Sequence, residues 1–209
     1  MSEKQTTKER LRQAACDIFA AKGYHDATVA EICEAAGANI AAVNYYFGGK
    51  EPLYDEVWRH AFAVATEAHP IEGSLPENPS LEDHLHSFAQ AILHRIFSAD
   101  ETGRFAKLLY REMAAPTLAL DRIAAEALLP QTRFLGEAIR PWLDKPIKKQ
   151  ELQLCLNSII GQCVFYNFSR PLRERVMGKK SISEKEIDRI ARHIARFSLG
   201  GLSAIKEPT

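Results

Sequence analysis

Residues 28–47 read Thr-Val-Ala-Glu-Ile-Cys-Glu-Ala-Ala-Gly-Ala-Asn-Ile-Ala-Ala-Val-Asn-Tyr-Tyr-Phe. The pattern Thr28-x-x-Glu31 is a capping box, which predicts the start of a helix. Apolar residues then recur at helical spacing until Gly37, which ends the helix because glycine readily adopts the left-handed conformation found after a helix C-terminus. A second short helix is predicted over residues 40–46. Two short helices joined by a tight glycine turn are typical of a helix-turn-helix.

The segment before this motif predicts one more helix, which packs against the other two. It begins at Thr6-x-x-Glu9, a second capping box, and ends at Gly23. Its apolar face carries Leu11, Ala15, Ile18 and Phe19. The residues spaced to turn inward from the third helix are Ile40, Val43 and Phe47. Residues 1–50 are therefore predicted to form a three-helix helix-turn-helix domain.

Residues 51–209 predict a second, larger helical domain. A connecting helix begins at Glu51-Pro52 and runs to Ala68, because proline is tolerated in the first turn of a helix. Residues 69–79 carry three prolines and predict a loop. Further helices are predicted over residues 80–99, 104–113, 118–143 with a kink or break before Pro130, 147–168 and 183–202. No run alternates as a strand does, so the predicted fold class is all-α.

Composition and cysteine spacing indicate a folded chain in the cytoplasm. The apolar share of 46% and the charged share of 26% are those of a soluble globular protein. The polar N-terminus lacks the apolar core of an export signal, and the apolar stretch 152–168 is shorter than the roughly 20 residues that span a membrane. No C-x-x-C spacing relates the four cysteines, Cys16, Cys33, Cys155 and Cys163. We therefore expect reduced thiols, no metal, no cofactor and no membrane partner.

The second short helix of the motif is expected to enter the major groove of DNA, where its exposed side chains meet base edges. With the inward positions removed, the outward residues are Asn39, Ala41, Ala42, Asn44 and Tyr45. Asparagine suits adenine, and alanine suits the methyl group of thymine. The residues placed to bind phosphate oxygens are Thr28, Tyr46 and Lys50.

Two features of the motif allow a plainer interpretation. Short polar residues near a helix start often only cap the helix, so the same face could simply be solvated. The first fifty residues also carry six basic and six acidic side chains, rather than the basic excess typical of a DNA-binding module. We therefore expect affinity to depend on hydrogen bonds and dimer geometry, with a modest dependence on salt.

The motif and its flanks resemble a known family of regulators. Residues 28–54, from Thr-Val-Ala-Glu to Lys-Glu-Pro-Leu-Tyr, resemble the DNA-binding domain of the TetR family of repressors, and Leu11 to Tyr24 resemble its first helix. Asn44 and Tyr45 stand where that family most often has Tyr and His, which leaves the base contacts open. Together with Leu-Leu-Tyr-Arg-Glu-Met-x-x-Pro-Thr at residues 108–117, the motif is similar to the CecR-type branch.

This resemblance implies a homodimer that binds operator DNA and senses a small molecule. Two C-terminal helices would pack against their mates in a four-helix bundle about a two-fold axis. The residues predicted for this seam are Leu152, Cys155, Leu156, Ile159, Ile160, Cys163, Ile187, Ile190, Ile194 and Phe197. The alternative is that these helices bury their apolar faces within one subunit, as amphipathic helices usually do.

The middle helices would enclose the small-molecule site. Apolar and aromatic side chains typical of ligand cavities are Phe88, Ile92, Phe105, Leu109, Met113, Trp142, Phe165 and Tyr166. Such side chains also build ordinary cores. Their apolar character favours a hydrophobic or aromatic effector over a highly charged one, without identifying the compound.

Other charged and titratable clusters are given structural interpretations. His84, His86 and His94 lack the ligand spacing of a metal site and are expected to be structural or surface residues. The basic run Arg170, Arg173, Arg175, Lys179 and Lys180 is expected to be a solvated loop rather than a nucleic-acid patch.

Two other functional classes remain as alternatives. The chain could be a DNA-binding regulator without an effector, with its C-terminal helices serving only as a dimer scaffold. It could also be a helical-bundle enzyme, but the sequence lacks the Glu-x-x-His pairs, the G-x-S-x-G elbow, the phosphate loop and the dinucleotide fingerprint. We therefore predict no enzymatic activity. The operator, the regulated genes and the sign of regulation do not follow from these residues.

Overall fold

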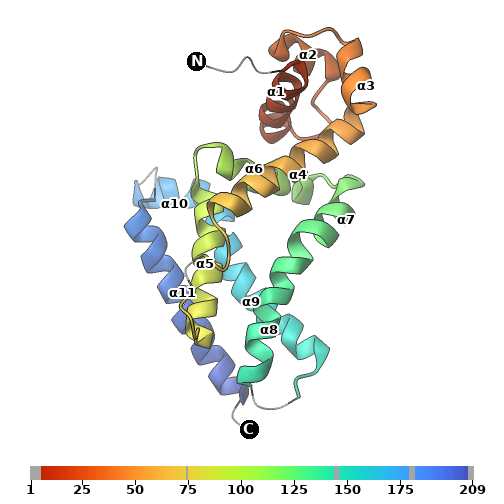
Figure 1. The fold of residues 1–209 in the computed structure, drawn as a ribbon. Helices are drawn as coiled ribbons and strands as arrows, with labels where there is room; N and C mark the ends of the chain where they lie inside the picture. Colours follow the sequence, from red (N-terminus) through yellow and green to blue (C-terminus); the bar gives the residue numbers. More distant parts are fainter. Residues whose placement is uncertain (1–5, 74, 144–145, 179–181, 207–209) are drawn as a thin grey trace. The chain divides into compact units, whose positions relative to one another are not determined.

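The structure is a computed structural model that describes residues 6–73, 75–143, 146–178 and 182–206. Over these ranges the chain forms helices joined by turns, with no strand, which confirms the all-α prediction (Figure 1). The chain divides into two compact units, one made of Met1–Ala68 with Ala99–Ala125 and the other of His69–Ser98 with Glu126–Thr209. The predicted domain 1–50 lies wholly inside the first unit, which also takes in a segment from the middle of the chain.

The first unit contains the N-terminal helices and this inserted segment. Its elements are α1 (Thr7–Lys22), α2 (Val29–Ala36), α3 (Ala41–Phe47), α4 (Lys50–Ala68), the short 3₁₀ turn η1 (Glu101–Gly103), α6 (Arg104–Ala114) and α7 (Ala119–Ile123). The capping boxes predicted at Thr6 and Thr28 are confirmed. In the second, the Thr28 hydroxyl accepts the backbone N–H of Glu31 at 3.2 Å, and the Glu31 carboxylate accepts the backbone N–H of Thr28 at 3.1 Å.

Aromatic residues of α1 and α4 form the centre of the first unit. The Phe19 and Tyr54 rings meet edge to face with their centroids 4.8 Å apart, and the Tyr24 ring lies 5.1 Å from Tyr54. From α2 and α3, Ile32 and Val43 are fully buried. Because the apolar positions of all four helices are buried together, the short helices α2 and α3 are held by packing rather than by intrinsic helix propensity.

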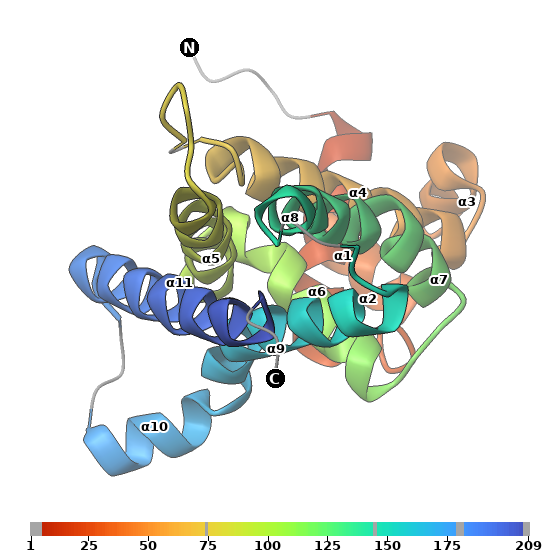
Figure 2. The ribbon, with the colours of Figure 1, turned by 90° about the horizontal axis from the view of Figure 1, so that it is seen from below.

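The second unit contains α5 (Leu81–Phe97), α8 (Leu129–Trp142), α9 (Lys149–Phe168), α10 (Arg170–Met177) and α11 (Glu184–Lys206). Figure 2 shows α5 and α8 nearly end-on, with α11 running across the view. The core between α5, α8, α9 and α11 includes Leu85, Phe88, Leu135, Ile139, Leu156 and Ile159. A second cluster joins α5 to α9 and α11 and includes Ala89, Leu93, Cys163, Ile187 and Ile194.

A buried arginine fixes the loop before α5. Arg95 donates hydrogen bonds to the carbonyl oxygen of His69 at 2.5 and 3.0 Å and to the side-chain oxygen of Gln131 at 2.6 Å. Burial lowers the pKa of its guanidinium to about 10, so the group remains charged at neutral pH. The guanidinium therefore ties the loop to α5 and α8.

The structure defines one predicted irregularity and corrects one predicted element. The kink or break predicted before Pro130 is a π-helical turn, η2 (Ala124–Leu128), that keeps the chain helical from α7 into α8. Proline has no N–H to donate to the preceding turn, which favours a local change of helical register there.

The basic run that was predicted as a loop contains the helix α10, which begins with Pro171 in its first turn and ends at Gly178 with φ +66°. Arg170 pairs with Glu174 at 2.8 Å, and the Arg173 guanidinium lies over the Phe97 ring. Lys179 and Lys180 lie outside the described residues.

Candidate nucleic-acid interface

The turn between α2 and α3 is set by Gly37. Its backbone has φ +60° and ψ +43°, the left-handed conformation, and its N–H donates to the carbonyl oxygen of Glu34 at 3.1 Å. The next N–H, of Ala38, donates to the carbonyl oxygen of Cys33 at 2.9 Å. These bonds satisfy the last carbonyl groups of α2 and turn the chain directly into α3.

Asn39 has a structural task at the start of α3. Its side-chain oxygen accepts the backbone N–H of Ala41 at 2.9 Å, so the residue caps the helix. The side-chain NH₂ of Asn39 still has donors for a ligand, but bidentate pairing with adenine would share an oxygen that is already in use. Asn44, one helical turn further on, is exposed and has the same amide chemistry.

The outward face of α3 is as predicted except at one position. Ala41, Asn44, Tyr45 and Tyr46 are exposed, with Tyr45 at 82%, and Ala42 is half-buried. Val43 and Phe47 point into the core, but Ile40 is 59% exposed, so the prediction that Ile40 faces inward is wrong. Ile40 lies just before the first turn of α3. This helix packs mainly against α4, which begins just after the C-terminus of α3. Ile40 therefore adds an apolar group to the outward face.

The two exposed tyrosines support each other. Their rings meet edge to face with centroids 4.8 Å apart. This contact restricts Tyr45, which would otherwise be a freely rotating side chain. Aromatic groups held in this way can bind to the methyl groups and sugars of a nucleic acid without a change in conformation.

Lys50 is half-buried beside the motif. Its Nζ lies 4.4 Å from the centre of the Tyr24 ring, a cation–π contact. Desolvation by burial lowers the pKa of its ammonium group. Because the ring directs the ammonium group, Lys50 presents a positioned charge rather than a mobile one.

The hydroxyl of Thr28 is already hydrogen-bonded to Glu31 in the structure. It donates to the Glu31 carboxylate at 3.1 Å and accepts the Glu31 N–H. Lys22 pairs with the same carboxylate at 2.5 Å, and these groups lower the pKa of Glu31, with Lys22 contributing most. A phosphate at this helix end would meet the carboxylate as well as free N–H groups, so the predicted phosphate contact of Thr28 requires its hydroxyl to exchange partners.

The predicted effector residues are divided between the two units. Phe105, Leu109 and Met113 lie on α6 in the first unit, whereas Phe88, Ile92, Trp142, Phe165 and Tyr166 lie in the second. Phe88, Ile92 and Trp142 pack in one core cluster. Met113 and Phe165 are exposed. The effector-binding role of the set stays a prediction.

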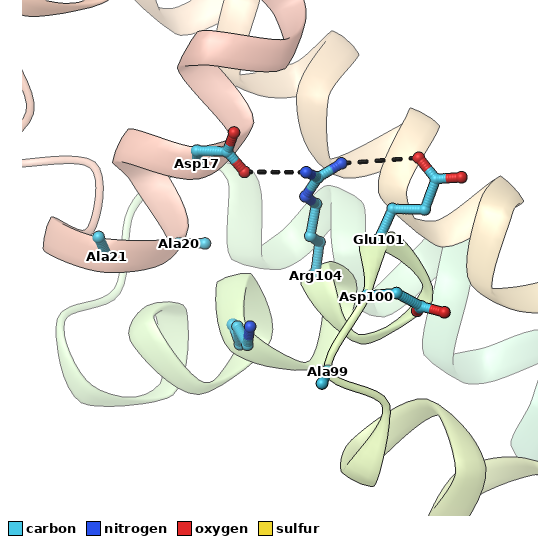
Figure 3. A pocket seen from close by; sticks show the side chains of 8 residues that line it. Asp17, Ala20, Ala21, Ala99, Asp100, Glu101 and Arg104 are labelled. Carbon is cyan, nitrogen blue, oxygen red and sulfur yellow. Dashed lines mark ion pairs between the residues drawn. The ribbon is translucent and has the colours of Figure 1, made fainter.

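A pocket of about 280 Å³ lies in the first unit between α1 and the η1–α6 segment, as Figure 3 shows. Its lining side chains are alanines and charged residues, and none of them belongs to the predicted effector set. Arg104 lies between Asp17 at 3.1 Å and Glu101 at 3.7 Å, so its charge is already paired. The lining does not suit an apolar ligand.

Most of the residues predicted for a dimer seam lie in the core of a single chain. Leu152, Cys155, Leu156, Ile159, Cys163, Ile187 and Ile194 are buried, Ile160 and Ile190 are partly buried against the same clusters, and Phe197 alone is exposed. The buried members have little surface left for a partner, and the assignment of the set to a seam between copies stays a prediction. Apolar residues lie on both faces of α9, and spacing alone does not say which face turns inward.

The sequence analysis did not identify the outer face of α9 as an exposed apolar surface. Leu154, Val164, Phe165 and Phe168 are exposed, and α9 carries no charged residue from Leu152 to its end. The absence of charge over residues 152–168 can be read from the sequence, and it is the signal that predicts an apolar outer face.

The three histidines interpreted as structural or surface residues make contacts within the second unit. His86 lies 3.2 Å from Asp188, His94 lies 3.4 Å from Glu184, and the His84 ring contacts the Phe134 ring. Across the described ranges, no three His, Cys, Asp or Glu side chains are grouped so as to hold a metal ion. Nor is any described helix long and apolar enough to cross a membrane.

Comparison with known families accounts for most of the chain. Residues 11–57 match the family described as bacterial regulatory proteins, tetR family, and residues 81–202 match the C-terminal domain of the HTH-type transcriptional dual regulator CecR. CecR of Shigella flexneri is 25% identical over 79% of this chain and 78% of its own length.

Two solved structures have a similar fold over nearly the full length. The fatty acid degradation regulator FadR from Bacillus halodurans has a TM-score of 0.67 at 18% identity, covering 96% of this chain and 98% of its own. FadR from Bacillus subtilis, in complex with stearoyl-CoA, has a TM-score of 0.68 at 15% identity, covering 92% of this chain and 97% of its own. At this identity the likeness concerns the fold.

Replacing Gly37 tests the geometry of the turn. A Cβ at this position would meet nothing within 4 Å, so Gly37→Ala introduces no clash, but the positive φ remains unfavourable for alanine. We expect Gly37→Ala to lower the free energy of unfolding by about 1 kcal/mol and Gly37→Asn to lower it less. Urea unfolding followed by circular dichroism measures both. Equal stability of all three proteins would contradict the left-handed turn.

Proposed function

The chain belongs to the TetR family of bacterial regulatory proteins and has a C-terminal domain of the CecR type, and we therefore propose that it is a repressor that binds palindromic operator DNA as a homodimer. A small hydrophobic or aromatic effector would release it. The observation that carries the proposal is the exposed face of α3, held on a buried core and set by the Gly37 turn. Because this regulator acts on bacterial DNA, its proposed location is the cytoplasm.

Each DNA contact is assigned from the local geometry. Asn44 is the adenine-reading residue, because its amide is exposed and a helical turn away from the cap. Ala41, Ala42 and Tyr45 contact thymine methyl groups and neighbouring sugars. The side-chain oxygen of Asn39 caps the start of α3, and its NH₂ group donates to the DNA backbone.

The phosphate contacts flank this face. Lys50 and Tyr46 bind phosphate oxygens, and Thr28 joins them when its hydroxyl leaves Glu31. Two of the cations carried by α1 are paired with carboxylates, Lys8 with Glu56 and Lys22 with Glu31. This supports a modest salt dependence for the binding.

The homodimer is proposed to form through the outer face of α9 with the exposed part of α11. Leu154 and Phe165 are 68% and 61% exposed, and Phe197 of α11 is exposed as well. The cores of protein interfaces are depleted in charge and enriched in aromatic residues, as this face is. A second copy fits the face because an isologous interface pairs the same patch on both subunits.

Regulation is proposed to act on the spacing of the two recognition helices. A dimer that reads a palindrome holds these helices about one DNA turn apart, or about 34 Å. An effector that binds better to a different spacing lowers operator affinity, with a coupling of about 1 to 3 kcal/mol. The helix α4, which leads directly from α3 toward the second unit, is the proposed connector.

The effector class is proposed from the apolar character of the predicted lining, of which Phe88 and Trp142 pack in one cluster of the second unit. A fold relative binds stearoyl-CoA, which has a long apolar chain. The class proposed here is therefore a compound with a large hydrophobic or aromatic part. A regulator without any effector is the second candidate, and the description of CecR as a dual regulator leaves activation open for this chain.

DNA binding can be measured by fluorescence anisotropy with the DNA that flanks the gene and with fragments selected from random DNA. Asn44→Ala is expected to weaken binding to the preferred sequence by about 1 to 3 kcal/mol and to reduce discrimination at one base pair. Lys50→Ala should weaken binding to all sequences alike and reduce the salt slope by about 1. Lys185→Ala, an exposed lysine on α11, is the control. Failure of the wild-type protein to bind any selected fragment would contradict the proposal.

The dimer face can be tested by placing charge on it. Leu154→Glu and Phe165→Glu leave the core of the monomer intact and are each expected to weaken dimerisation by roughly a hundredfold or more. Sedimentation equilibrium measures the association, and circular dichroism checks the fold. Leu118→Glu, which charges an exposed leucine in the first unit, should leave the dimer unchanged. If the α9 variants remain dimers as tight as the wild type, the face is assigned wrongly.

The effector class can be tested by thermal shift with fatty acids, acyl-CoA esters and aromatic compounds. A ligand at a hundred times its Kd should raise the melting temperature by roughly 5 °C or more, because it binds the native state alone. The same compound should lower operator affinity in the anisotropy assay. A compound that raises the melting temperature but leaves operator affinity unchanged would count against release, and no shift with any class would favour the regulator without effector.

A further inference from the structure

The motif Leu-Leu-Tyr-Arg-Glu-Met-x-x-Pro-Thr at residues 108–117 has no part in reading DNA, yet it meets the DNA-binding helices. We propose that Glu112, through its hydrogen bond with Tyr54, is a positioning residue that fixes the helix-turn-helix relative to the rest of the chain and so sets the operator half-site spacing. Its effect on the half-site spacing of the operator rests on the proposed function. The positioning itself can be measured without DNA.

Glu112 is a buried carboxylate whose donors are neutral. It is 1% exposed, and the Tyr54 hydroxyl, on a residue that is also 1% exposed, donates to it at 2.8 Å. Thr117 donates to it twice, from the backbone N–H and from the hydroxyl, both at 3.0 Å. Burial raises the pKa of Tyr54 far above its usual value, so its hydroxyl remains a donor. A buried carboxylate is costly unless hydrogen-bonded, so its partners are strongly constrained.

Tyr54 connects Glu112 to the helix-turn-helix. Its ring packs on Phe19 of α1 and on Tyr24, while its hydroxyl reaches α6. One residue of α4 thus contacts the DNA-binding core and the inserted segment together. Loss of the hydrogen bond between Tyr54 and Glu112 would therefore affect both the DNA-binding core and the inserted segment.

The other bonds of the inserted segment lie nearer the surface. Arg111 donates to the carbonyl oxygen of Ala21 near the end of α1, and Arg104 donates to Gln13 at 3.2 Å and pairs with Asp17. Arg122 on α7 pairs with Asp55 of α4 at 3.0 Å and with Glu51 at 3.1 Å. Exposed pairs of this kind contribute little each, whereas the bond between Tyr54 and Glu112 is fully buried.

Chain connectivity makes this attachment consequential. The chain passes between the two units three times, after Ala68, after Ser98 and after Ala125. The last crossing falls inside the π-helical turn Ala124–Leu128. If the inserted segment is fastened to α1 and α4, all three crossings restrain the helix-turn-helix. If it is released, only the crossing after Ala68 does.

Tyr54→Phe removes the hydroxyl while keeping the ring, and Tyr24→Phe is the matched control in the same aromatic cluster. Glu112→Gln is the conservative variant, because its amide can still accept from Thr117 and donate to the Tyr54 oxygen. Spin labels at Glu34→Cys on α2 and Arg189→Cys on α11 report the distance between the units. Both sites are exposed and the four native cysteines are buried, so labelling is selective. Dilution with unlabelled protein removes distances between copies.

We expect the distance distribution to broaden in Tyr54→Phe and to match the wild type in Tyr24→Phe and Glu112→Gln. With selected operators whose half-sites are moved by one or two base pairs, the wild-type preference for one spacing should fall by roughly fivefold or more in Tyr54→Phe. Unchanged distances in folded Tyr54→Phe would overturn the positioning role. Broader distances with an unchanged spacing preference would overturn its link to the operator. Broader distances in a protein that binds no DNA would support the positioning role and reject the proposed function.

Discussion

The contact of Tyr54 with Phe19 is the interaction on which the arrangement of the first unit depends. The ring of Tyr54 fills the space between α1 and α4, and its hydroxyl is satisfied by Glu112 from a segment nearly sixty residues away. The short helices α2 and α3 have too few residues to be stable alone. They exist because the α1–α4 core buries Ile32, Val43 and Phe47.

This core presents a candidate interface that is polar and aromatic rather than basic. Asn44 and Tyr45 are exposed, Lys50 is directed by the Tyr24 ring, and Lys22 is neutralised by Glu31. An interface of this kind gains little from bulk attraction to phosphate and depends more on the positions of its hydrogen-bonding groups. The orientation of α3 therefore matters more here than in a strongly basic module.

The second unit illustrates how one helix can serve two surfaces. The inner side of α9 packs Leu156, Ile159 and Cys163 into the chain's own core, and its outer side leaves Leu154 and Phe165 exposed. Because the helix is uncharged from Leu152 to its end, burial of the outer side would not strand an ionised group. Because no charged residue marks a solvent-facing side of α9, the sequence alone does not distinguish its inner face from its outer face.

The sequence by itself determined the local features of this protein. The capping boxes at Thr6 and Thr28, the glycine turn at Gly37 and the apolar spacing of α1 are set by interactions within a few residues, and they were predicted with nearly the observed bounds. Only the tertiary structure decided that Ile40 is exposed, that most of the predicted seam residues are buried within one chain, and that Glu112 meets Tyr54. Those outcomes depend on which faces of distant helices come together, and the spacing of residues along one helix carries no information about its partner.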